Sequence, residues 1–350
     1  MIQAEAKRGA ERATSALPRA LQEFLRALPL VLIVGATGAQ AQAPTPSPAL
    51  SGRMASMVVP YPAGGPADVT ARQIEPAMRR SLGHGFIIEN MPGASGAIAI
   101  EKVLQAPKDG HMVLFADASN VILAPLALSA VRHKPEQLRL VGMASRTPLL
   151  LVSGMQLSAS TLKELLAAAR KPEAAPLTYG SFGAGSVPHL AGEDFALRQG
   201  IKMTHVPYRG AAPLMQDLVG GQVQLAFMPM GGNTVDMIQQ KKLKAYAITD
   251  GHRAARMAET PTMAEAIGLQ DFNFEMWGGI FASREVPVEI ATRLNKAVDE
   301  GLVDPDFRRQ LEAAGGVVGA RMNLDELGKF YAAEVAKFAA IAAAIKLQPQ

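Results

Sequence analysis

A short apolar run, a glycine-rich turn and an amphipathic helix follow one another near the start of the patterned part of the chain. Met57–Val59 is typical of a buried strand, and the turn PYPAGGPAD follows it at 60–68. Asp68 is expected to be the N-cap of a helix that ends near Leu82, and Pro76 predicts a kink or an early break in that helix. Backbone amides at such a turn can bind an anion, although an ordinary strand-to-helix connection fits the stretch equally well.

The same alternation continues through the rest of the chain. Further strands are expected at 86–88, 112–115, 138–143, 149–152, 177–180, 203–206, 223–228 and 244–249. One further helix is expected to follow the glycine-rich loop at 90–96 and to end near residue 106. Others are expected at 161–170, 187–199, 211–219, 234–240, 287–302, 304–314 and 323–345. Strands that alternate with helices predict an α/β fold with a largely parallel sheet. Ligands of such sheets bind at the loops that follow the carboxyl ends of the strands.

Composition excludes several classes of protein and site. The chain has 350 residues, of which 49% are hydrophobic, so it can form two packed domains. A net charge of +4 is too small to indicate nucleic-acid binding. The sequence has no cysteine, and its six histidines form no closely spaced pair. We therefore expect no disulfide, no metal site and no cofactor.

The first 43 residues have the pattern of a secretory signal. Five basic residues precede an apolar run at Leu28–Ala36, and small-x-small cleavage sites follow at 39–43. We therefore expect a signal peptide at 1–43, a Pro/Ser-rich linker at 44–53 and a periplasmic mature protein. A short membrane anchor is the alternative for the apolar run, and the long basic region leaves the true start codon open.

Six segments resemble, in order and in spacing, the substrate-binding proteins of tripartite tricarboxylate transporters, which are also called the Bug family. They are VVPYPAGGPAD (58–68), IIENMPGASG (87–96), APKDGHMVLFA (106–116), LTYGSFGAGSVPHLAGEDF (177–195), HVPYRGAAPLMQDLVGGQVQLAF (205–227) and WGGIFA (277–282). Each motif is weak alone, but the ordered set is specific. The resemblance covers essentially all of residues 54–347.

The resemblance implies an α/β, type II periplasmic-binding-protein fold, with two lobes joined by a hinge and two interlobe crossings. We expect the first lobe at 54–151 plus 277–350 and the second lobe at 152–276. Such lobes close on a ligand like a hinged trap. The implied ligand is a small carboxylate, and the implied partner is a two-subunit membrane transporter. The protein is then a monomeric receptor and not an enzyme.

Residues at the strand-end loops are the candidate ligand contacts. They are Tyr61, Ala63, Gly64, Gly65, Asp68, Ser119, Asn120, Ser181, Gly185, Ser186, His189, Tyr208, Arg209, Gly210 and Met228. In the family a carboxylate is held mostly by backbone amides of such loops and partly through water. Asp68 could instead cap its helix, and His189 could instead pack or brace its loop. Arg209 could pair with a second carboxylate or remain solvated.

Two departures from the family pattern bear on the ligand. Met228-Pro229 stands where members often have an acidic residue that can pair with an ammonium group, so an amino acid is less favoured than a more apolar acid. The segment at 116–120 is less hydroxyl-rich than usual, which puts the hydrogen bonding on that side in doubt.

Three other functions compete with transport. A secreted hydrolase would need Gly-x-Ser-x-Gly, and the nearest run, at 93–97, ends in alanine. A dinucleotide enzyme would need Gly-x-Gly-x-x-Gly, and Gly183-Ala184-Gly185 is followed by Pro188 instead. A receptor that signals to a membrane partner would use the same fold and pocket, so the sequence does not separate it from a transport receptor.

Overall fold

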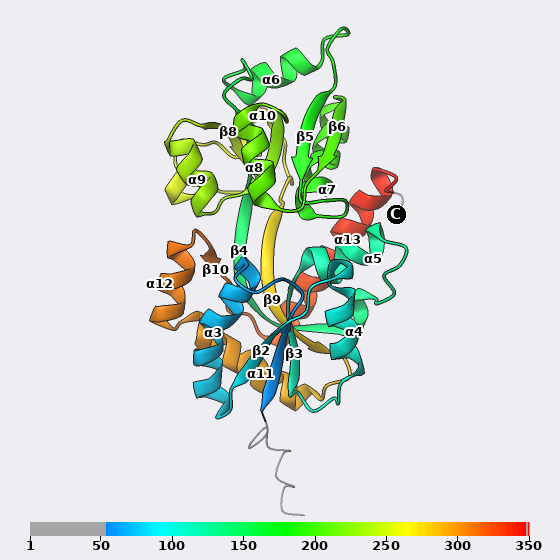
Figure 1. Cartoon of the computed structure of the whole chain (residues 1–350), viewed down its shortest axis with the longest axis vertical. Helices are drawn as coiled ribbons and strands as arrows, with labels where there is room; N and C mark the ends of the chain where they lie inside the picture. Colours follow the sequence, from blue (N-terminus) through cyan, green and yellow to red (C-terminus); the bar gives the residue numbers. More distant parts are fainter. Residues whose placement is uncertain (1–53, 348, 350) are drawn as a thin grey trace, which may run out of the picture. The chain divides into compact units, whose positions relative to one another are not determined.

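The computed structural model describes residues 54–347 and 349 (Figure 1). The signal peptide and linker expected at 1–43 and 44–53 lie outside these residues. Within the described part of the chain, no helix combines the length and the apolar character needed to cross a membrane.

The strands form one ten-stranded mixed sheet. Eight of them are hydrogen-bonded to their neighbours in the order β2-β1-β3-β9-β4-β7-β5-β6. Their bounds are β1 Ala55–Val59, β2 Phe86–Asn90, β3 Met112–Asp117, β4 Leu138–Gly154, β5 Leu177–Ser181, β6 Met203–Pro207, β7 Leu225–Pro229, β8 Leu243–Ile248, β9 Glu275–Ser283 and β10 Val317–Val318. Strands β8 and β10 also pair with β4. We call the part around β1–β3 the first lobe and the part around β5–β8 the second lobe.

Helices surround the sheet in both lobes. The α-helices are α3 Pro66–Leu82, α4 Ala97–Gln105, α5 Ala124–Ala127, α6 Leu162–Ala169, α7 Val187–Gln199, α8 Ala211–Gly220, α9 Gly232–Gln239, α10 Met263–Ile267, α11 Val288–Leu302, α12 Pro305–Ala313 and α13 Leu324–Ala344. Short 3₁₀ turns lie at η2 Ala94–Gly96, η4 Pro135–Gln137 and η5 Ala255–Met257, and a π turn, η3, lies at Ser119–Leu123.

The two lobes are connected by β4 and β9. Strand β4 pairs with β9 from Leu138 to Pro148 and then with β7 from Leu149 to Ser153. The chain therefore enters the second lobe on β4 and returns on β9. The predicted α/β class with two lobes and two crossings is confirmed, whereas the residue limits of the lobes, expected at 151/152 and 276/277, remain a prediction.

Two expectations about these strands were wrong. The segments at 138–143 and 149–152 are one continuous strand, because pairing with β9 and β10 carries β4 through the polar residues between them. The sheet is also not largely parallel. Among the strands that the structure describes, the parallel pairs are β1 with β2 and β3, and β5 with β6 and β7. The returning strand β9 lies between β3 and β4 and runs opposite to both.

The N-cap of helix α3 lies three residues before the predicted cap, Asp68. Gly65 is the N-cap, Pro66 occupies the first helical position and Asp68 lies in the first turn. Proline fits that position because the amide it lacks would have no helical partner there. The helix also continues through Pro76 to Leu82 without a break. Its buried side, which includes Ile74, lies in one apolar cluster with α11, and this packing offsets the lost hydrogen bond.

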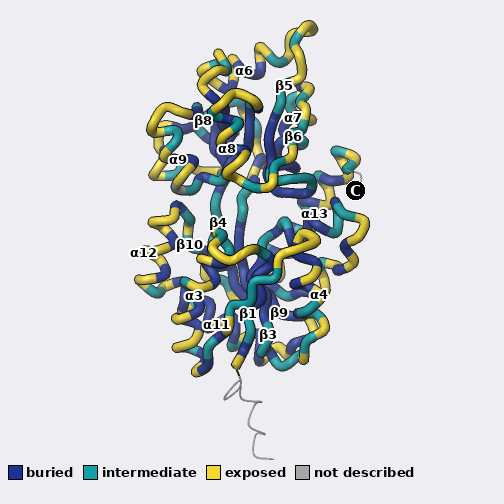
Figure 2. Tube along the Cα trace, viewed as in Figure 1, coloured by how far each residue is buried: buried dark blue, intermediate teal, exposed yellow. Residues whose placement is uncertain are grey.

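Buried residues concentrate in the strands and on the inner sides of the helices (Figure 2). Helix α13 is attached to β9 by a hydrogen bond from Trp277 Nε1 to Glu334 Oε2 at 2.9 Å. Farther along α13, the ring of Phe338 lies 6.3 Å from that of Phe274, centroid to centroid. The last helix therefore follows the return strand towards the second lobe.

Candidate functional site

The loops expected to bind a ligand follow the carboxyl ends of four strands. Residues 60–65 follow β1, residues 118–120 follow β3, residues 182–186 follow β5 and residues 208–210 follow β6. Strands β1 and β3 are parallel neighbours, as are β5 and β6. Because parallel strands end at the same edge, each lobe gathers its two loops at one edge of its sheet.

In the first lobe, Asp117 joins the β1 and β3 loops. Its Oδ2 accepts a 2.6 Å hydrogen bond from the Tyr61 hydroxyl, and its Oδ1 accepts bonds from the amides of Ser119 (2.8 Å) and Asn120 (3.3 Å). Burial raises the pKa of the Asp117 carboxyl, although these donors oppose the shift. Burial and the nearby Asp117 carboxyl raise the pKa of Tyr61 well above its ordinary value. Tyr61 is therefore a neutral donor that holds two loops together.

Asp68 braces the glycine turn rather than capping the helix. Its Oδ2 accepts a 2.8 Å bond from the Gly64 amide, and its Oδ1 accepts a 2.9 Å bond from Asn90 Nδ2. Arg72 adds an ion pair at 3.0 Å. Burial alone would raise the pKa of Asp68, but the bonds from Arg72, Gly64 and Asn90 outweigh it and lower the pKa. The carboxylate is therefore ionised. It accepts hydrogen bonds from three donor groups, and the residue is 2% exposed.

In the second lobe, the loop between β5 and α7 is closed by its own side chains. Ser186 caps α7 by accepting from the His189 amide at 3.4 Å, and its hydroxyl donates to the Gly183 carbonyl at 2.8 Å. Ser181 does not cap the helix. Its hydroxyl donates to that same carbonyl at 3.1 Å. The Gly185 amide donates to His189 Nδ1 at 3.1 Å, so this histidine braces the loop.

Two histidines lie beneath this loop. The rings of His189 and His205 stack with centroids 4.2 Å apart, and His205 Nε2 lies 2.6 Å from Ser181 Oγ. Burial lowers the pKa of His189 to about 4. Burial, with a smaller contribution from His189, lowers the pKa of His205 to about 4 as well. Both rings are therefore neutral at neutral pH.

These lowered pKa values predict that the protein loses stability in mild acid. Each histidine titrates near 6.5 when unfolded, so below that pH the unfolded state binds protons that the folded state does not. The free energy of unfolding should fall as the pH is lowered from 6.5 towards 4, by up to about 3 kcal/mol for His189. Chemical denaturation at a series of pH values measures this slope. His189→Gln should reduce the slope of the unfolding free energy against pH, whereas His252→Gln, at an exposed position, should leave this slope unchanged. An unchanged slope in His189→Gln would contradict the assignment of this pH dependence to His189.

The β6 loop contributes a fixed tyrosine and an exposed arginine. The Tyr208 hydroxyl donates to Asp217 Oδ2 at 2.7 Å, and its amide donates to the Ser181 carbonyl at 2.9 Å. Burial, together with Asp217, raises the pKa of Tyr208 to about 12. Arg209 is exposed and forms no ion pair with any described residue. Gly210 has φ of 122° and is the N-cap of α8.

One contact brings the loops of the two lobes together. A Cβ atom built on Gly185 would lie 2.4 Å from Ala127 Cβ, and its next neighbour would be the Leu123 carbonyl at 3.6 Å. The second-lobe loop therefore lies against η3 and α5, which continue directly from Ser119 and Asn120. Among the described residues, the amides of Ala63 and Ala184 have no hydrogen-bond acceptor.

Most of the predicted residues lie on these loops, but Met228 does not. Its side chain is 1% exposed and belongs to the apolar cluster that contains Leu150 and Val235. The sequence prediction also missed Asp117, Asn90 and His205. Each is a polar residue within a strand that is otherwise apolar or amphipathic, and this was the one signal available for them.

Two α/β lobes whose strand-end loops meet, with free backbone amides, define a solute-binding protein. Among the described residues, no group of three or more histidine, aspartate or glutamate side chains could hold a metal ion. The chain belongs to the tripartite tricarboxylate transporter receptor family, because the sequence model described as "Tripartite tricarboxylate transporter family receptor" matches residues 70–347.

Relatives of known sequence agree with this family. A UPF0065 protein from the TAR-I ttuE-ttuC' intergenic region of Agrobacterium vitis is 32% identical over 279 residues, covering 80% of this chain and 78% of the relative. Protein BugT of Bordetella pertussis is 30% identical over 301 residues, covering 85% and 91%. The match therefore extends over nearly the whole described part of this chain.

Solved structures share the fold. The periplasmic binding protein BugD has a TM-score of 0.70 and 30% identity over 85% of this chain and 99% of its own. R. palustris Rpa4515 with adipate has a TM-score of 0.72 and 28% identity, over 85% of this chain and 99% of its own. MatC (Rpa3494) from Rhodopseudomonas palustris with bound malate has a TM-score of 0.70 and 29% identity, over 82% of this chain and 98% of its own. The expected periplasmic-binding-protein fold and the Bug-family resemblance are confirmed, and this is the fold of solute-binding receptors.

Proposed function

We propose that the protein captures a small carboxylate between its two lobes and delivers it to a membrane transporter of the tripartite tricarboxylate type. The observation that supports this most strongly is the contact of the Gly183–Ser186 loop with η3 and α5, which puts the glycine-rich loop of the second lobe against the segment that follows β3 in the first lobe. The relatives crystallised with adipate and with malate support a carboxylate as the ligand.

In this proposal the backbone provides the recognition. The amides of Ala63 and Ala184 bind the anion, directly or through water, and the starts of α3 and α7 add favourable dipoles. Asp68 and His189 act indirectly, because they hold the Gly64 and Gly185 amides in place. Arg209, which is exposed and has no ion pair with the described residues, pairs with a second carboxylate of the ligand.

Methionine at position 228 leaves no acidic group there to hold an ammonium group. The Met228 side chain itself is 1% exposed and lies in an apolar cluster. An acid without an amino group therefore fits better than an amino acid. The remaining parts of the proposal are a periplasmic location, reached through the signal peptide, a monomeric state, a two-subunit transporter as partner and no enzymatic activity.

A thermal-shift panel tests the ligand class. It contains dicarboxylates, citrate, amino acids, benzoate-type acids and the amide of each acid, added to the purified protein. A ligand at about 100 times its dissociation constant should stabilise the fold by roughly 2.7 kcal/mol. We expect at least one acid to raise the melting midpoint while its amide does not. A shift with neutral solutes and none with any acid would contradict a carboxylate receptor.

A further inference from the structure

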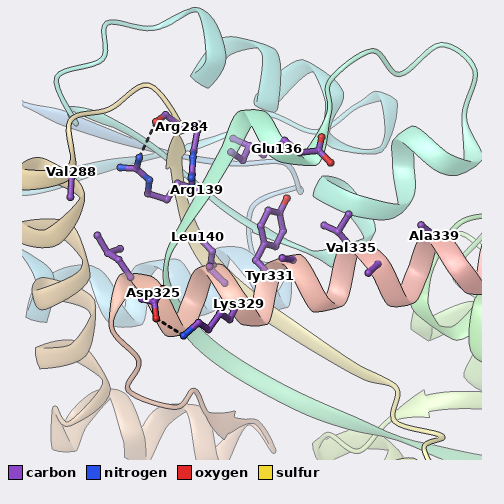
Figure 3. A pocket seen from close by; sticks show the side chains of 15 residues that line it. Glu136, Arg139, Leu140, Arg284, Val288, Asp325, Lys329, Tyr331, Val335 and Ala339 are labelled. Atoms are coloured by element: carbon purple, nitrogen blue, oxygen red, sulfur yellow. Dashed lines mark hydrogen bonds and ion pairs between the residues drawn. The ribbon is translucent and has the colours of Figure 1, made fainter.

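The first lobe has a groove that is separate from the strand-end loops. It encloses about 810 Å³ and lies between α13, the start of β4 and the loop that follows β9 (Figure 3). Strand β4 begins at Leu138 and pairs there with Ser283, the last residue of β9. The antiparallel pairing of β3 with β9 puts this end of β9 beside the start of β3, so the groove is at the opposite end of the sheet from the Asp117 loop.

One wall of the groove is a row of small side chains on α13. Gly328, Ala332, Ala336 and Ala339 line it and are exposed, and Val335 beside them is half-buried. Their spacing of three or four residues puts them on one face of the helix. A solvent-facing side of a helix normally carries charged side chains, but this face has none between Lys329 and the end of the row. The row therefore leaves a shallow apolar trough of roughly 16 Å along the helix axis.

The other surfaces of the groove are apolar as well. Leu138 and Leu140 form its floor and are each 2% exposed. Val288, at the start of α11, is 58% exposed on the rim. This exposed valine is apolar surface that a ligand could remove from water.

Two arginines at one end of the groove have no acidic partner. Arg139 donates from Nη1 to the Val286 carbonyl at 3.0 Å and from Nη2 to the Arg284 carbonyl at 3.1 Å. Arg284 is exposed, and neither guanidinium forms an ion pair with any described residue. Burial, and to a smaller extent repulsion by the like charge of Arg284, lower the pKa of Arg139. An anion placed beside them would relieve that repulsion.

The other charged groups of the groove do not neutralise this pair. Lys329 is already paired with Asp325 at 2.7 Å. Figure 3 draws the Glu136 carboxylate apart from both arginines, and it draws Val335 and Ala339 farther along α13 than the arginine pair. The groove therefore has a cationic end and an apolar length.

We propose that this groove binds a free single-chain anionic amphiphile, such as a medium-chain carboxylate. The head group would lie at Arg139 and Arg284, and the chain would lie along Gly328–Ala339. The length of the trough suits a chain of about twelve carbons. Each buried CH₂ should strengthen binding by up to about fourfold, so affinity should rise with chain length up to that size. The site does not depend on the proposed carboxylate site between the lobes.

Calorimetric titration of dodecanoate, below its micelle concentration, into the purified protein tests the proposal. We expect one bound dodecanoate per chain and no binding of dodecyltrimethylammonium. Ala336→Glu puts a carboxylate into the trough on an exposed helix position and should weaken binding by at least about tenfold. Arg284→Gln should weaken it several-fold. Ala333→Glu, also exposed on α13 but outside the groove, is the matched control and should bind like the unmodified protein.

Three results would overturn the proposal. The first is equal affinity of Ala336→Glu and the unmodified protein for dodecanoate. The second is equal binding of the cationic and anionic amphiphiles. The third is binding to vesicles of anionic phospholipid without binding to free dodecanoate, which would indicate a membrane-facing surface instead.

Discussion

Replacing Gly185 with alanine should abolish tight ligand binding. Gly185 has φ of 75°, a conformation that costs a residue with a Cβ about 1–2 kcal/mol. The new Cβ would also lie 2.4 Å from Ala127 Cβ, which is closer than two non-bonded carbon atoms can approach. The loop of the second lobe must then move away from η3 and α5. We expect the dissociation constant for the strongest acid of the panel to rise at least about tenfold.

Two further variants separate the contact from the backbone strain. Gly200→Ala has a similar φ of 62°, but no atom lies within 4 Å of its new Cβ. It should cost about 1 kcal/mol of stability and leave affinity unchanged. Ala127→Gly combined with Gly185→Ala removes the clashing atom and should restore part of the affinity. Unchanged binding by Gly185→Ala alone, or no rescue by the double variant, would show that ligand affinity does not depend on the contact between Gly185 and Ala127.

Removal of the Asp68 carboxylate should cause a large loss of stability. Asp68→Ala removes a carboxylate that is 2% exposed, so the Gly64 amide loses its acceptor and Asn90 Nδ2 keeps only the Tyr61 carbonyl. A buried donor without a partner costs about 1–3 kcal/mol. The free energy of unfolding, measured by chemical denaturation, should therefore fall by about 3 kcal/mol. Ligand affinity should fall too, because the turn at 62–65 is no longer fixed.

Asp325→Ala is a matched control for this variant. Asp325 also lies in the first turn of a helix and also pairs with a basic residue four positions later, but its side chain is 74% exposed. Exposed pairs contribute little, so the loss should be below about 0.5 kcal/mol. If the two variants lose the same stability, Asp68 acts only as a helix-terminal charge and does not brace the turn.

The local elements could be predicted from the sequence because their signals are local. The capping box of Thr161 and Glu164 is present, with the Glu164 amide donating to Thr161 Oγ1 at 3.2 Å. Asp304 caps α12 with Pro305 in the first turn, as its sequence indicated. The start of α3 was misplaced because a proline at the first helical position moves the N-cap back to Gly65, which has no capping side chain.

The long-range features could not be read in the same way. The polar residues 145–148 suggested a gap between two strands, yet pairing with β9, more than a hundred residues later, makes them part of β4. The hydrogen bond of Tyr61 to Asp117 and the stacking of His189 on His205 also join different elements. The position of the candidate loops at the strand ends was predictable from the α/β pattern, but which side chains brace these loops depends on tertiary packing.

A crystal structure with the acid that gives the largest thermal shift tests the central claim most directly. We expect a carboxylate group of this acid to lie within hydrogen-bond distance of amides in both the 61–65 turn and the 182–186 loop. The Asp68 and His189 side chains should still bind the Gly64 and Gly185 amides. An acid bound by one lobe alone, or at a position away from both loops, would contradict capture between the two lobes.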